Sequence, residues 1–461
     1  MRIRWCQEDN AHTFSIELSA DDHAKASGQH DSITLAQNTF RFVLPQRQEM
    51  HPDLLAAALL TVVQPFAGRQ IEMPLPVSVP FADVVQRVFN LELSPVNSQL
   101  EARKPGSRPG LAFSGGVDSL SSMMLMPEDT ALVFAERISH PHVDVPADLD
   151  TYSPLGAIEA FKGLERRSGR HVHRVQTDHE YIIGPYPDWA TWIGLGAPLM
   201  LMAETLDLDS IGFGGVLESN YIPDWNDFRY FPGDNGNETW QRVMTAVGIP
   251  IFRPLAGISE IGSTIISEAA PYSEIGVSCG NGQDGRPCGL CKKCVRKLLT
   301  RSTLRGTTPD RATLQRYAEQ PEIRKFLSEE RLKHVLMYSL VRLPPLPSMY
   351  FRRIQRGVRE VAPDLSFLER WYTKSLEHIP AKYRADFLAR KSRYLLDYTE
   401  KQIAQIESWE PVHFVAPEPD LGERSVNFGR RVVRGAGRRL RRYGSKVLSA
   451  ATRTAEGEQT V

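Results

Sequence analysis

The sequence lacks long apolar runs and has few cysteines, and each absence excludes a class of protein. The longest apolar stretch, residues 54–63, is too short to span a bilayer, and the start of the chain has no apolar signal core. We therefore expect a cytoplasmic protein. Five cysteines in 461 residues cannot build a disulfide framework. Net charge is also absent, since 55 basic residues balance 55 acidic ones, although this balance conceals a basic C-terminal tail.

The length and the local patterns predict several domains. Residues 1–105 mix strand-like and helix-like segments, which predicts a small α+β domain ended by a polar stretch rich in proline and glycine. Residues 110–301 alternate short apolar strands with helices, which predicts an α/β domain with a parallel sheet covered on both faces. Residues 302–415 predict a helical region, and residues 416–461 a basic, flexible tail.

Short apolar runs and helical periodicity locate the elements of the predicted α/β domain. The predicted strands are residues 111–113, 131–134, 172–175, 211–213 and 249–252. The predicted helices are residues 157–165, 192–206 and 240–247.

The most informative stretch is a short strand followed by a glycine turn and the start of a helix. Two adjacent glycines let the backbone approach a ligand, and the amides at a helix start attract an anion. Asp118 would repel a bare phosphate, so its presence in the loop indicates a divalent metal between carboxylate and phosphate. We predict that this loop binds a metal-bound nucleotide through Ser114, Gly115, Gly116, Val117, Asp118 and Ser119.

The loop is not that of an ordinary P-loop NTPase, because the chain contains no Gly-Lys dipeptide. Ser-Gly-Gly-Val-Asp-Ser instead resembles the PP-loop of the N-type ATP pyrophosphatases, which split ATP between its α and β phosphates to adenylylate a substrate. The resemblance implies that residues 114–119 hold the pyrophosphate end of ATP, that Asp118 binds Mg²⁺, and that Asp118 and Ser119 are catalytic. A glycine-rich turn without a ligand is the alternative interpretation.

A second glycine-containing loop follows the predicted strand at residues 211–213. It carries Glu218, Tyr221, Asp224 and Trp225. Carboxylates can bind Mg²⁺ or the polar groups of a planar heterocycle, and aromatic rings can stack on it. We predict that Asp224 is catalytic and orients the substrate, with Glu218 as a further substrate-binding residue. An ordinary surface loop whose aromatic residues pack locally is the alternative.

Four of the five cysteines form a cluster in the sequence. Eight, two and two residues separate Cys279, Cys288, Cys291 and Cys294, and glycines lie between them. Four thiolates at such spacings can surround one tetrahedral ion, which predicts a closed, structural Zn²⁺ site. An iron–sulfur cluster is the alternative, although the run matches a ferredoxin pattern only in part.

Together, the two loops and the cysteine cluster resemble the 7-cyano-7-deazaguanine synthases, known as QueC, over residues 110–301. Members adenylylate a deazapurine carboxylate, accept ammonia and dehydrate the amide to a nitrile. The resemblance implies a C–N ligase of the queuosine pathway type that uses ATP, Mg²⁺ and Zn²⁺, with a small carboxylate and ammonia or an amine as substrates. The family's Tyr-Pro-Asp-Cys is here residues 222–225, and Glu260 stands where the family has a lysine.

The additions on either side of the predicted α/β domain leave other functions open. A QueC-like component of antiphage defence, which modifies a protein or a nucleic acid, is one alternative. A non-catalytic module that senses a nucleotide is another. The tail carries nine basic residues and one acidic residue between positions 421 and 448, a composition that suits nucleic acid, an acidic membrane surface or an acidic protein partner. A homodimer is also left open.

Overall fold

The computed structural model describes residues 1–27, 33–138, 155–184, 188–223, 227–229, 237–276, 279, 287–328 and 333–416. Its strands are β1 (Arg2–Glu8), β2 (Ala11–Glu17), β3 (Thr34–Leu35), β4 (Thr39–Val43), β5 (Gln70–Ser78), β6 (Glu92–Asn97), β7 (Arg108–Ala112), β8 (Ala131–Arg137), β9 (Val172–Thr177), β10 (Ile183–Gly184), β11 (Leu208–Gly212) and β12 (Ile251–Phe252). Its helices are α1 (Ala20–Ala26), α2 (Pro52–Val63), α3 (Val79–Phe89), α4 (Val117–Leu125), α5 (Leu155–Ser168), α6 (Ala197–Leu201), α7 (Leu217–Asn220), α8 (Asn237–Ala246), α9 (Glu260–Ala269), α10 (Lys292–Leu304), α11 (Arg311–Glu319), α12 (Pro321–Leu327), α13 (His334–Arg342), α14 (Met349–Val361), α15 (Arg384–Lys391) and α16 (Glu400–Glu407).

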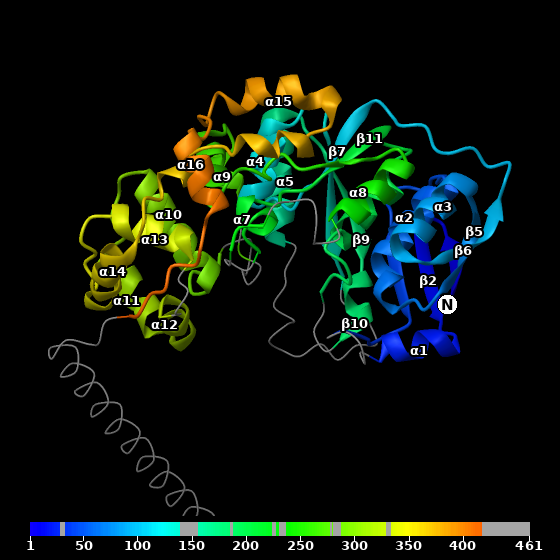
Figure 1. The fold of residues 1–461 in the computed structure, drawn as a ribbon, viewed down its shortest axis with the longest axis horizontal. Helices are drawn as coiled ribbons and strands as arrows, with labels where there is room; N and C mark the ends of the chain where they lie inside the picture. Colours follow the sequence, from blue (N-terminus) through cyan, green and yellow to red (C-terminus); the bar gives the residue numbers. More distant parts are fainter. Residues whose placement is uncertain are drawn as a thin grey trace, which may run out of the picture.

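The described residues form one mixed sheet of ten strands, between Arg2 and Phe252, in the order β12-β11-β7-β8-β9-β4-β2-β1-β5-β6 (Figure 1). The pairs from β12 to β9 are parallel, as are β1 with β5 and β5 with β6. The antiparallel pairs β9–β4, β4–β2 and β2–β1 lie between these two parallel parts. The protein is therefore of the α/β class, as predicted, with a mostly parallel sheet.

In the parallel part of the sheet, the direction in which successive strands are added reverses between β7 and β11. From β7 the chain proceeds to β8 and β9 on one side, then returns to the other side of β7 with β11 and β12. Loops at the carboxyl ends of two such strands diverge to opposite faces, and the crevice between them is where open α/β sheets bind ligands. Both glycine-containing loops predicted from the sequence follow these two strands.

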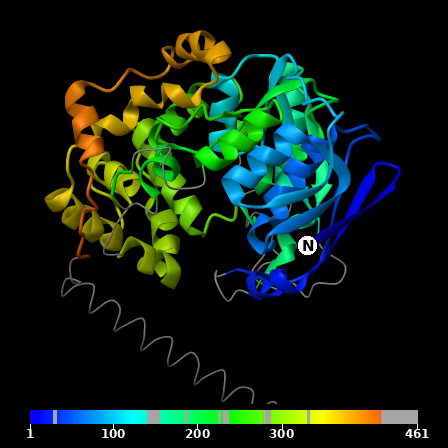
Figure 2. The same cartoon turned by 45° about the vertical axis from the view of Figure 1, so that its right-hand side comes forward.

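Helices cover both faces of the parallel part of the sheet (Figures 1 and 2). On one face α2, α3, α6 and α8 share a hydrophobic core with strands from both halves of the sheet. On the other face α4, α5 and α9 pack with the C-terminal residues Trp371, Tyr383 and Phe387. Strands buried on both faces read as continuous apolar runs, which is why short apolar segments marked them in the sequence.

The hydrophobic cores cross both of the domain boundaries predicted at residues 105–110 and 301–302. The N-terminal strands join the parallel strands through the β4–β9 pair and share one core with them. The helical region shares a second core with Leu217, Tyr221 and Ile261 of the α/β part. Two separate hydrophobic cores thus connect the three predicted regions, one across each predicted boundary.

The predicted strands of the α/β part are confirmed as β7, β8, β9, β11 and β12, with shifts of a few residues at their ends. The helix predicted over residues 192–206 is wrong in its extent, because the regular α-helix is limited to α6. Gly194, Gly196 and Pro198 disfavour a longer helix. Packing also favours glycine at position 196, because a Cβ there would lie 2.7 Å from the ring of Phe213. No helix in the described ranges is long and apolar enough to cross a membrane.

A buried hydrogen bond joins the C-terminal region to the sheet. Its removal tests whether the two parts stabilise each other. The Tyr383 hydroxyl donates to the carboxylate of Asp209 in β11, with oxygen–oxygen distances of 2.8 and 2.7 Å. Tyr383→Phe will lower the free energy of unfolding by about 1–3 kcal/mol, because Asp209 loses a buried partner. Chemical denaturation monitored by circular dichroism measures this change. Tyr394→Phe, which removes the hydroxyl of a half-buried tyrosine, is the control; an equal loss in both variants contradicts the prediction.

Candidate functional site

The loop after β7 has the geometry of an anion cradle. Gly115 has a φ of +70°, a conformation that favours glycine, and a Cβ there would lie 3.0 Å from the ring of Phe161. Gly116 is the N-cap residue of α4, so the loop ends at the positive end of a helix dipole, and the Gly116 amide donates to the Ser114 hydroxyl oxygen at 3.4 Å. The hydroxyls of Ser114 and Ser119 lie 3.3 Å apart, and Ser119 donates to the carbonyl of Gly116. Backbone amides and two hydroxyls therefore gather at one point.

Asp118 in the first turn of α4 is held by the neighbouring helix α9. The Ser263 hydroxyl donates to Oδ1 of Asp118 at 2.7 Å, and the Ser121 hydroxyl donates to the Ser263 carbonyl at 2.6 Å. Helix α9 is itself fixed at its start by Ser259, which accepts from the amides of Ile261 and Gly262. One Asp118 oxygen is thus oriented by hydrogen bonds from α9, and the side chain remains half-exposed at the loop.

The loop after β11 lies against the first loop, as the strand order requires. A Cβ on Gly214 would lie 3.2 Å from the carbonyl carbon of Asp118, so the two backbones pass closely. The Asn220 amide closes this second loop by donating to the carbonyls of Gly215 and Val216 at 3.0 and 2.7 Å. Asp224 and Trp225, predicted in the same loop, lie outside the described residues, and the predicted role of Asp224 stays a prediction.

Glu218 lies deeper than the sequence suggests. It is 4% exposed, and its two carboxylate oxygens accept from the Glu260 amide at 3.2 and 3.1 Å. His334 of α13 approaches one of these oxygens at 3.4 Å. Glu218 therefore connects the second loop, the start of α9 and the helical region, and its predicted contact with a substrate stays a prediction.

Tyr221 belongs to the core. Its side chain has no exposed surface, its ring stacks on Phe228 at 5.6 Å between centroids, and its hydroxyl lies 2.9 Å from Nε2 of His378. The suggestion that this ring stacks on a ligand is wrong in this structure, because neighbouring side chains cover it. The alternative interpretation, that aromatic residues of this loop pack locally, holds for Tyr221.

Charged side chains surround Asp118 on the side of α9 and α10. Arg296 pairs with Glu260 at 3.0 Å. Burial lowers the pKa of Lys297 to about 8, against the opposing influence of the Asp118 and Glu260 charges. Burial raises the pKa of Glu260 to about 7, and the nearby carboxylates of Glu218 and Asp118 act in the same direction. The charges of Asp118 and Glu260 thus influence the pKa of Lys297, a lysine of α10.

A second positive side chain lies near the two loops, at the carboxyl end of β12. Arg253 donates to the Asn220 side-chain oxygen at 2.7 Å, and its guanidinium lies 4.3 Å from the centre of the Trp192 indole. Arg253 is 8% exposed, and burial lowers its pKa to about 9. A guanidinium with so little water around it is electrostatically strong toward a carboxylate or phosphate.

The carboxyl ends of β8 and β9 carry a further charged pair. Arg137 at the end of β8 pairs with Glu180, just after β9, at 2.8 Å, and lies 5.2 Å from the centre of the Trp189 ring. Burial raises the pKa of Glu180 to about 7. These residues border the same edge of the sheet as the two loops, on the side away from β11 and β12.

The four cysteines form a compact cluster that fits a single metal ion. Their Sγ atoms all lie within 4.8 Å of one another, with distances of 3.4 Å (Cys279–Cys288), 3.9 Å (Cys279–Cys291) and 3.8 Å (Cys288–Cys294). Tetrahedral coordination with Zn–S bonds of about 2.3 Å requires sulfur atoms about 3.8 Å apart. The donor set can therefore hold one ion such as zinc, and it leaves no position for a substrate.

The cysteine cluster and the loop are joined by α10. Cys291 is the N-cap residue of α10 and Cys294 lies in its first turn, where the helix dipole favours thiolates. Lys297 follows Cys294 by three residues. One turn further, Arg301 pairs with Glu268 of α9 at 2.9 Å. The helix thus runs from the cluster past α9, which orients Asp118.

The sequence did not indicate Ser263, Lys297, Arg253, Arg137 or Glu180. Arg137 and Arg253 each stand at or just after the end of a parallel strand, and that position was the one signal available for them. Ser263 and Lys297 lie 145 and 179 positions after Asp118, on helices whose packing brings them to the loop. No local pattern marks such residues.

Comparison with known proteins gives one match. Residues 239–410 are similar to a family of unknown function (DUF6395), which covers less than half of the chain. The matched region begins in α8, contains the cysteine cluster and α10, and ends after α16. No curated protein and no solved structure matches the chain. The matched region crosses the predicted boundary at residue 302, in agreement with the shared core.

The cysteine cluster leads to a prediction about metal content. The purified protein will carry about one zinc ion per chain, and Cys291→Ser will lose most of it, because three thiolates and a hydroxyl bind zinc less tightly than four thiolates. Elemental analysis by mass spectrometry measures the content. Cys6→Ser is the control, since Cys6 is exposed and outside the cluster. Equal metal in all three proteins, or none in the wild type, contradicts the prediction.

Proposed function

We propose that the protein is an ATP-dependent, QueC-like enzyme that adenylylates a carboxylate and transfers the acyl group to a nitrogen nucleophile. The observation that carries the proposal is the position of the Ser114–Ser119 loop. It follows the central parallel strand at the reversal of strand order, where the start of α4 carries Asp118 and the hydroxyls of Ser114 and Ser119 lie 3.3 Å apart. This combination suits the phosphates of a nucleotide.

In the proposed reaction, a substrate carboxylate oxygen attacks the α-phosphorus of ATP. A P–O bond forms, the bond from the α-phosphorus to the bridging oxygen breaks, and pyrophosphate leaves with that electron pair. Ammonia or an amine then attacks the acyl carbon, loses a proton and displaces AMP. The amides of Gly115 and Gly116 and the hydroxyls of Ser114 and Ser119 would stabilise the departing pyrophosphate.

Asp118 and Lys297 would supply the charges for this step. Asp118 would hold Mg²⁺, which neutralises charge that develops on the phosphates. Ser263 keeps one Asp118 oxygen in a fixed direction through its 2.7 Å hydrogen bond. Lys297 would contribute a positive charge from α10, in place of the lysine that the resemblance leads one to expect at Glu260.

The acceptor would lie toward the second loop. Arg253, buried beside Trp192 and hydrogen-bonded to Asn220, offers a positive charge for the attacking carboxylate. Asp224 and Glu218 remain the predicted substrate-orienting residues. These features agree with a planar, deazapurine-type acid, and a protein or nucleic-acid acceptor in an antiphage role uses the same first step.

Release of pyrophosphate tests the proposal directly. Purified protein will release pyrophosphate from ATP with Mg²⁺, ammonia and a panel of deazapurine acids. Asp118→Asn will lower the rate at least about 100-fold, because a charged group that acts in the transition state is removed. Asp129→Asn, which removes an exposed carboxylate shortly after α4, will leave the rate unchanged.

Two outcomes overturn the proposal. If Asp118→Asn releases pyrophosphate as fast as the wild type, the loop is not the site of ATP cleavage. If calorimetry shows that the wild type binds ATP at this loop but no acceptor in the panel or in cell extract leads to its consumption, the protein is a nucleotide-sensing module.

The lowered pKa of Lys297 predicts how anion binding depends on pH. Burial lowers this pKa from 10.5 to about 8. The charged form is therefore complete below pH 7 and is lost as the pH rises through 8. The dissociation constant of pyrophosphate will increase about tenfold from pH 7 to pH 9, because about one molecule in ten then keeps the proton.

Isothermal titration calorimetry with pyrophosphate measures this dependence. Lys297→Arg will bind equally at both pH values after correction for the ionisation of pyrophosphate, since arginine keeps its proton. Lys297→Met will bind weakly at both. Lys293→Met, an exposed lysine of the same helix, will behave as the wild type. The same pH dependence in Lys297→Met as in the wild type refutes the assignment.

A further inference from the structure

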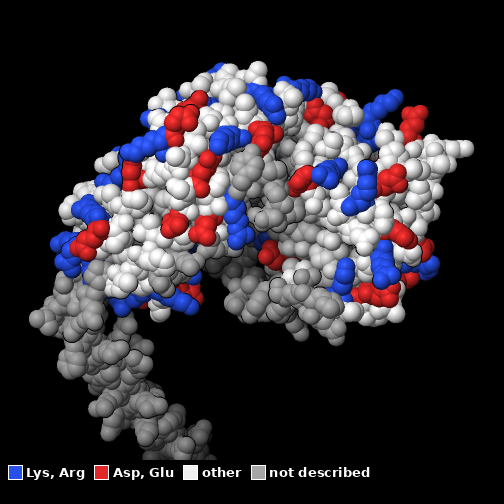
Figure 3. Space-filling model, viewed as in Figure 1, with Lys and Arg blue, Asp and Glu red and all other residues white. Residues whose placement is uncertain are grey.

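The charge of the chain is divided unequally along the sequence. Residues 1–301 contain 25 basic and 36 acidic side chains, whereas residues 302–461 contain 30 basic and 19 acidic ones. The neutral total therefore consists of a region of net charge −11 and a region of net charge +11. Lys and Arg are exposed over the end of the molecule formed by α11, α12 and α14, with acidic side chains among them (Figure 3). Such asymmetry favours a polyanionic partner for the C-terminal region.

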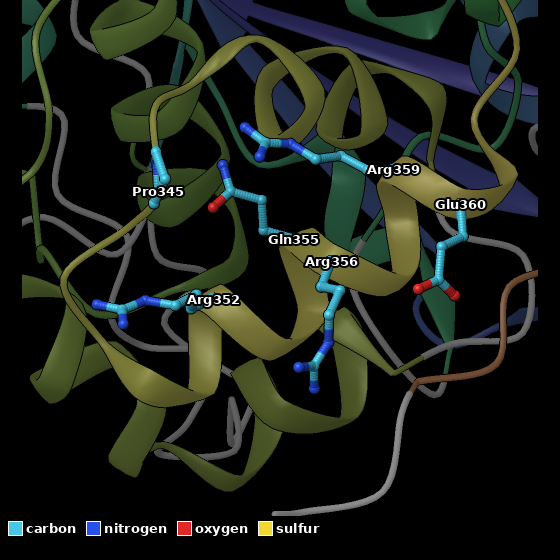
Figure 4. A pocket seen from close by; sticks show the side chains of 6 residues that line it. All are labelled: Pro345, Arg352, Gln355, Arg356, Arg359 and Glu360. Atoms are coloured by element: carbon cyan, nitrogen blue, oxygen red, sulfur yellow. The ribbon is translucent and has the colours of Figure 1, made fainter.

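A pocket of about 390 Å³ lies at this end of the molecule. It is formed by α14 and by the proline-rich segment before it, residues 343–347. Its lining contains the three arginines Arg352, Arg356 and Arg359, with Gln355, Pro345 and one acidic residue, Glu360 (Figure 4). In Figure 4, Arg352, Gln355 and Arg359 extend from α14 toward the side of Pro345, whereas Glu360 lies at the far end of the row. Three of the six lining residues are thus arginines, and in Figure 4 the Arg356 side chain extends away from the Pro345 side.

The shape of the pocket is fixed by buried hydrogen bonds between α14 and the proline-rich segment. Gln355 is 1% exposed. Its side-chain nitrogen donates to the carbonyls of Leu340, Leu343 and Pro344, and its oxygen accepts from the Leu346 amide at 3.1 Å. This one side chain fastens the proline-rich segment to α14, so the position of the pocket does not depend on a flexible loop.

Two of the arginines are also oriented by this segment. Arg352 donates through Nε to the Leu346 carbonyl at 3.0 Å, and Arg359 donates through Nη2 to the Leu343 carbonyl at 2.6 Å. A guanidinium carries five N–H donors, so each retains several beyond these contacts. Pre-orientation lowers the entropy that the side chains lose when they bind an anion.

We propose that this arginine pocket on α14 binds the sugar-phosphate backbone of a nucleic acid. Arg352, Arg356 and Arg359 lie within eight residues of helix, with about 10 Å between the first and the last, which is enough for two successive phosphates of one strand. Guanidinium forks bind phosphate oxygens through paired hydrogen bonds. This proposal does not depend on the ATP chemistry of the Ser114–Ser119 loop.

A membrane surface fits this helix less well. A helix that lies in a bilayer interface inserts its apolar face. In α14 the apolar face, made by Phe351, Ile354 and Val358, is buried in the core of the helical region. Three exposed arginines, Arg352, Arg356 and Arg359, lie on the outer side of α14, and the exposed apolar residues Met349 and Val361 are confined to its two ends.

The basic tail begins on the same part of the molecule. Phe414, near the end of the described chain, belongs to the same hydrophobic cluster as the apolar face of α14. The ten basic residues after position 416 are thus tethered to the body that carries the pocket. Two sets of positive charge on one body increase the affinity for an extended polyanion through effective concentration.

Binding of labelled oligonucleotides to the full chain tests the proposal. In fluorescence anisotropy at 100 mM salt, the triple variant Arg352→Gln, Arg356→Gln, Arg359→Gln will bind a 20-nucleotide single strand at least about tenfold more weakly than the wild type. The slope of log K against log salt concentration will fall by about 1.4, because contacts to two phosphates are lost at about 0.7 each. RNA, single-stranded DNA and duplex DNA serve as parallel probes.

The matched control removes the same charge elsewhere. Arg41→Gln, Arg69→Gln, Arg87→Gln changes three exposed arginines of the N-terminal region and will keep the wild-type affinity and slope. Unfolding curves of all variants show whether a loss of binding comes from a loss of folding. The single variant Arg356→Gln, which removes one charge, will change the slope by about 0.7. Equal weakening in both triple variants, no difference from the wild type, or binding only to phosphatidylserine vesicles or inorganic phosphate overturns the proposal. Loss of pyrophosphate release from ATP has no bearing on it.

Discussion

The hydrogen-bonded contact between α4 and α9 is the constraint on which the candidate site depends. Ser263 binds Asp118, Ser121 binds the backbone of Ser263, and Ser259 caps the helix that carries it. Helix α9 also packs against α10, the helix that carries Lys297. A polar contact between two helices thereby converts a generic helix start into a site with a directed carboxylate and a nearby cation.

The position of the cysteine cluster matters for the arrangement of α9 and α10. A closed four-cysteine site has no position for a substrate, and in isolation it is a local clip. Here it stands at the start of α10, which carries Lys297 and the arginines that pair with α9. A metal ion bound in this place would stabilise the start of α10, the helix that carries Lys297 and packs against α9.

Much of the fold followed from local patterns. The parallel strands, α2, α3 and the break at the prolines before α14 were predictable, because apolar runs, helical periodicity and proline act over short distances. The continuity of the sheet from β9 into β4 was not. Pairing between strands more than 130 residues apart depends on which edges meet, and composition changes at residues 101–110 suggested a boundary where the core continues.

By itself, the sequence determined the glycine loop with Asp118, the cysteine cluster and the division of charge, since each is a property of neighbouring residues. Only the tertiary structure decided that Glu218 and Tyr221 are buried, that Ser263 binds Asp118 and Arg253 binds Asn220, and that Gln355 shapes an arginine pocket. The physical reason is separation along the chain. Side chains far apart in sequence meet through the packing of helices and strands, and no local pattern encodes which of them will face one another.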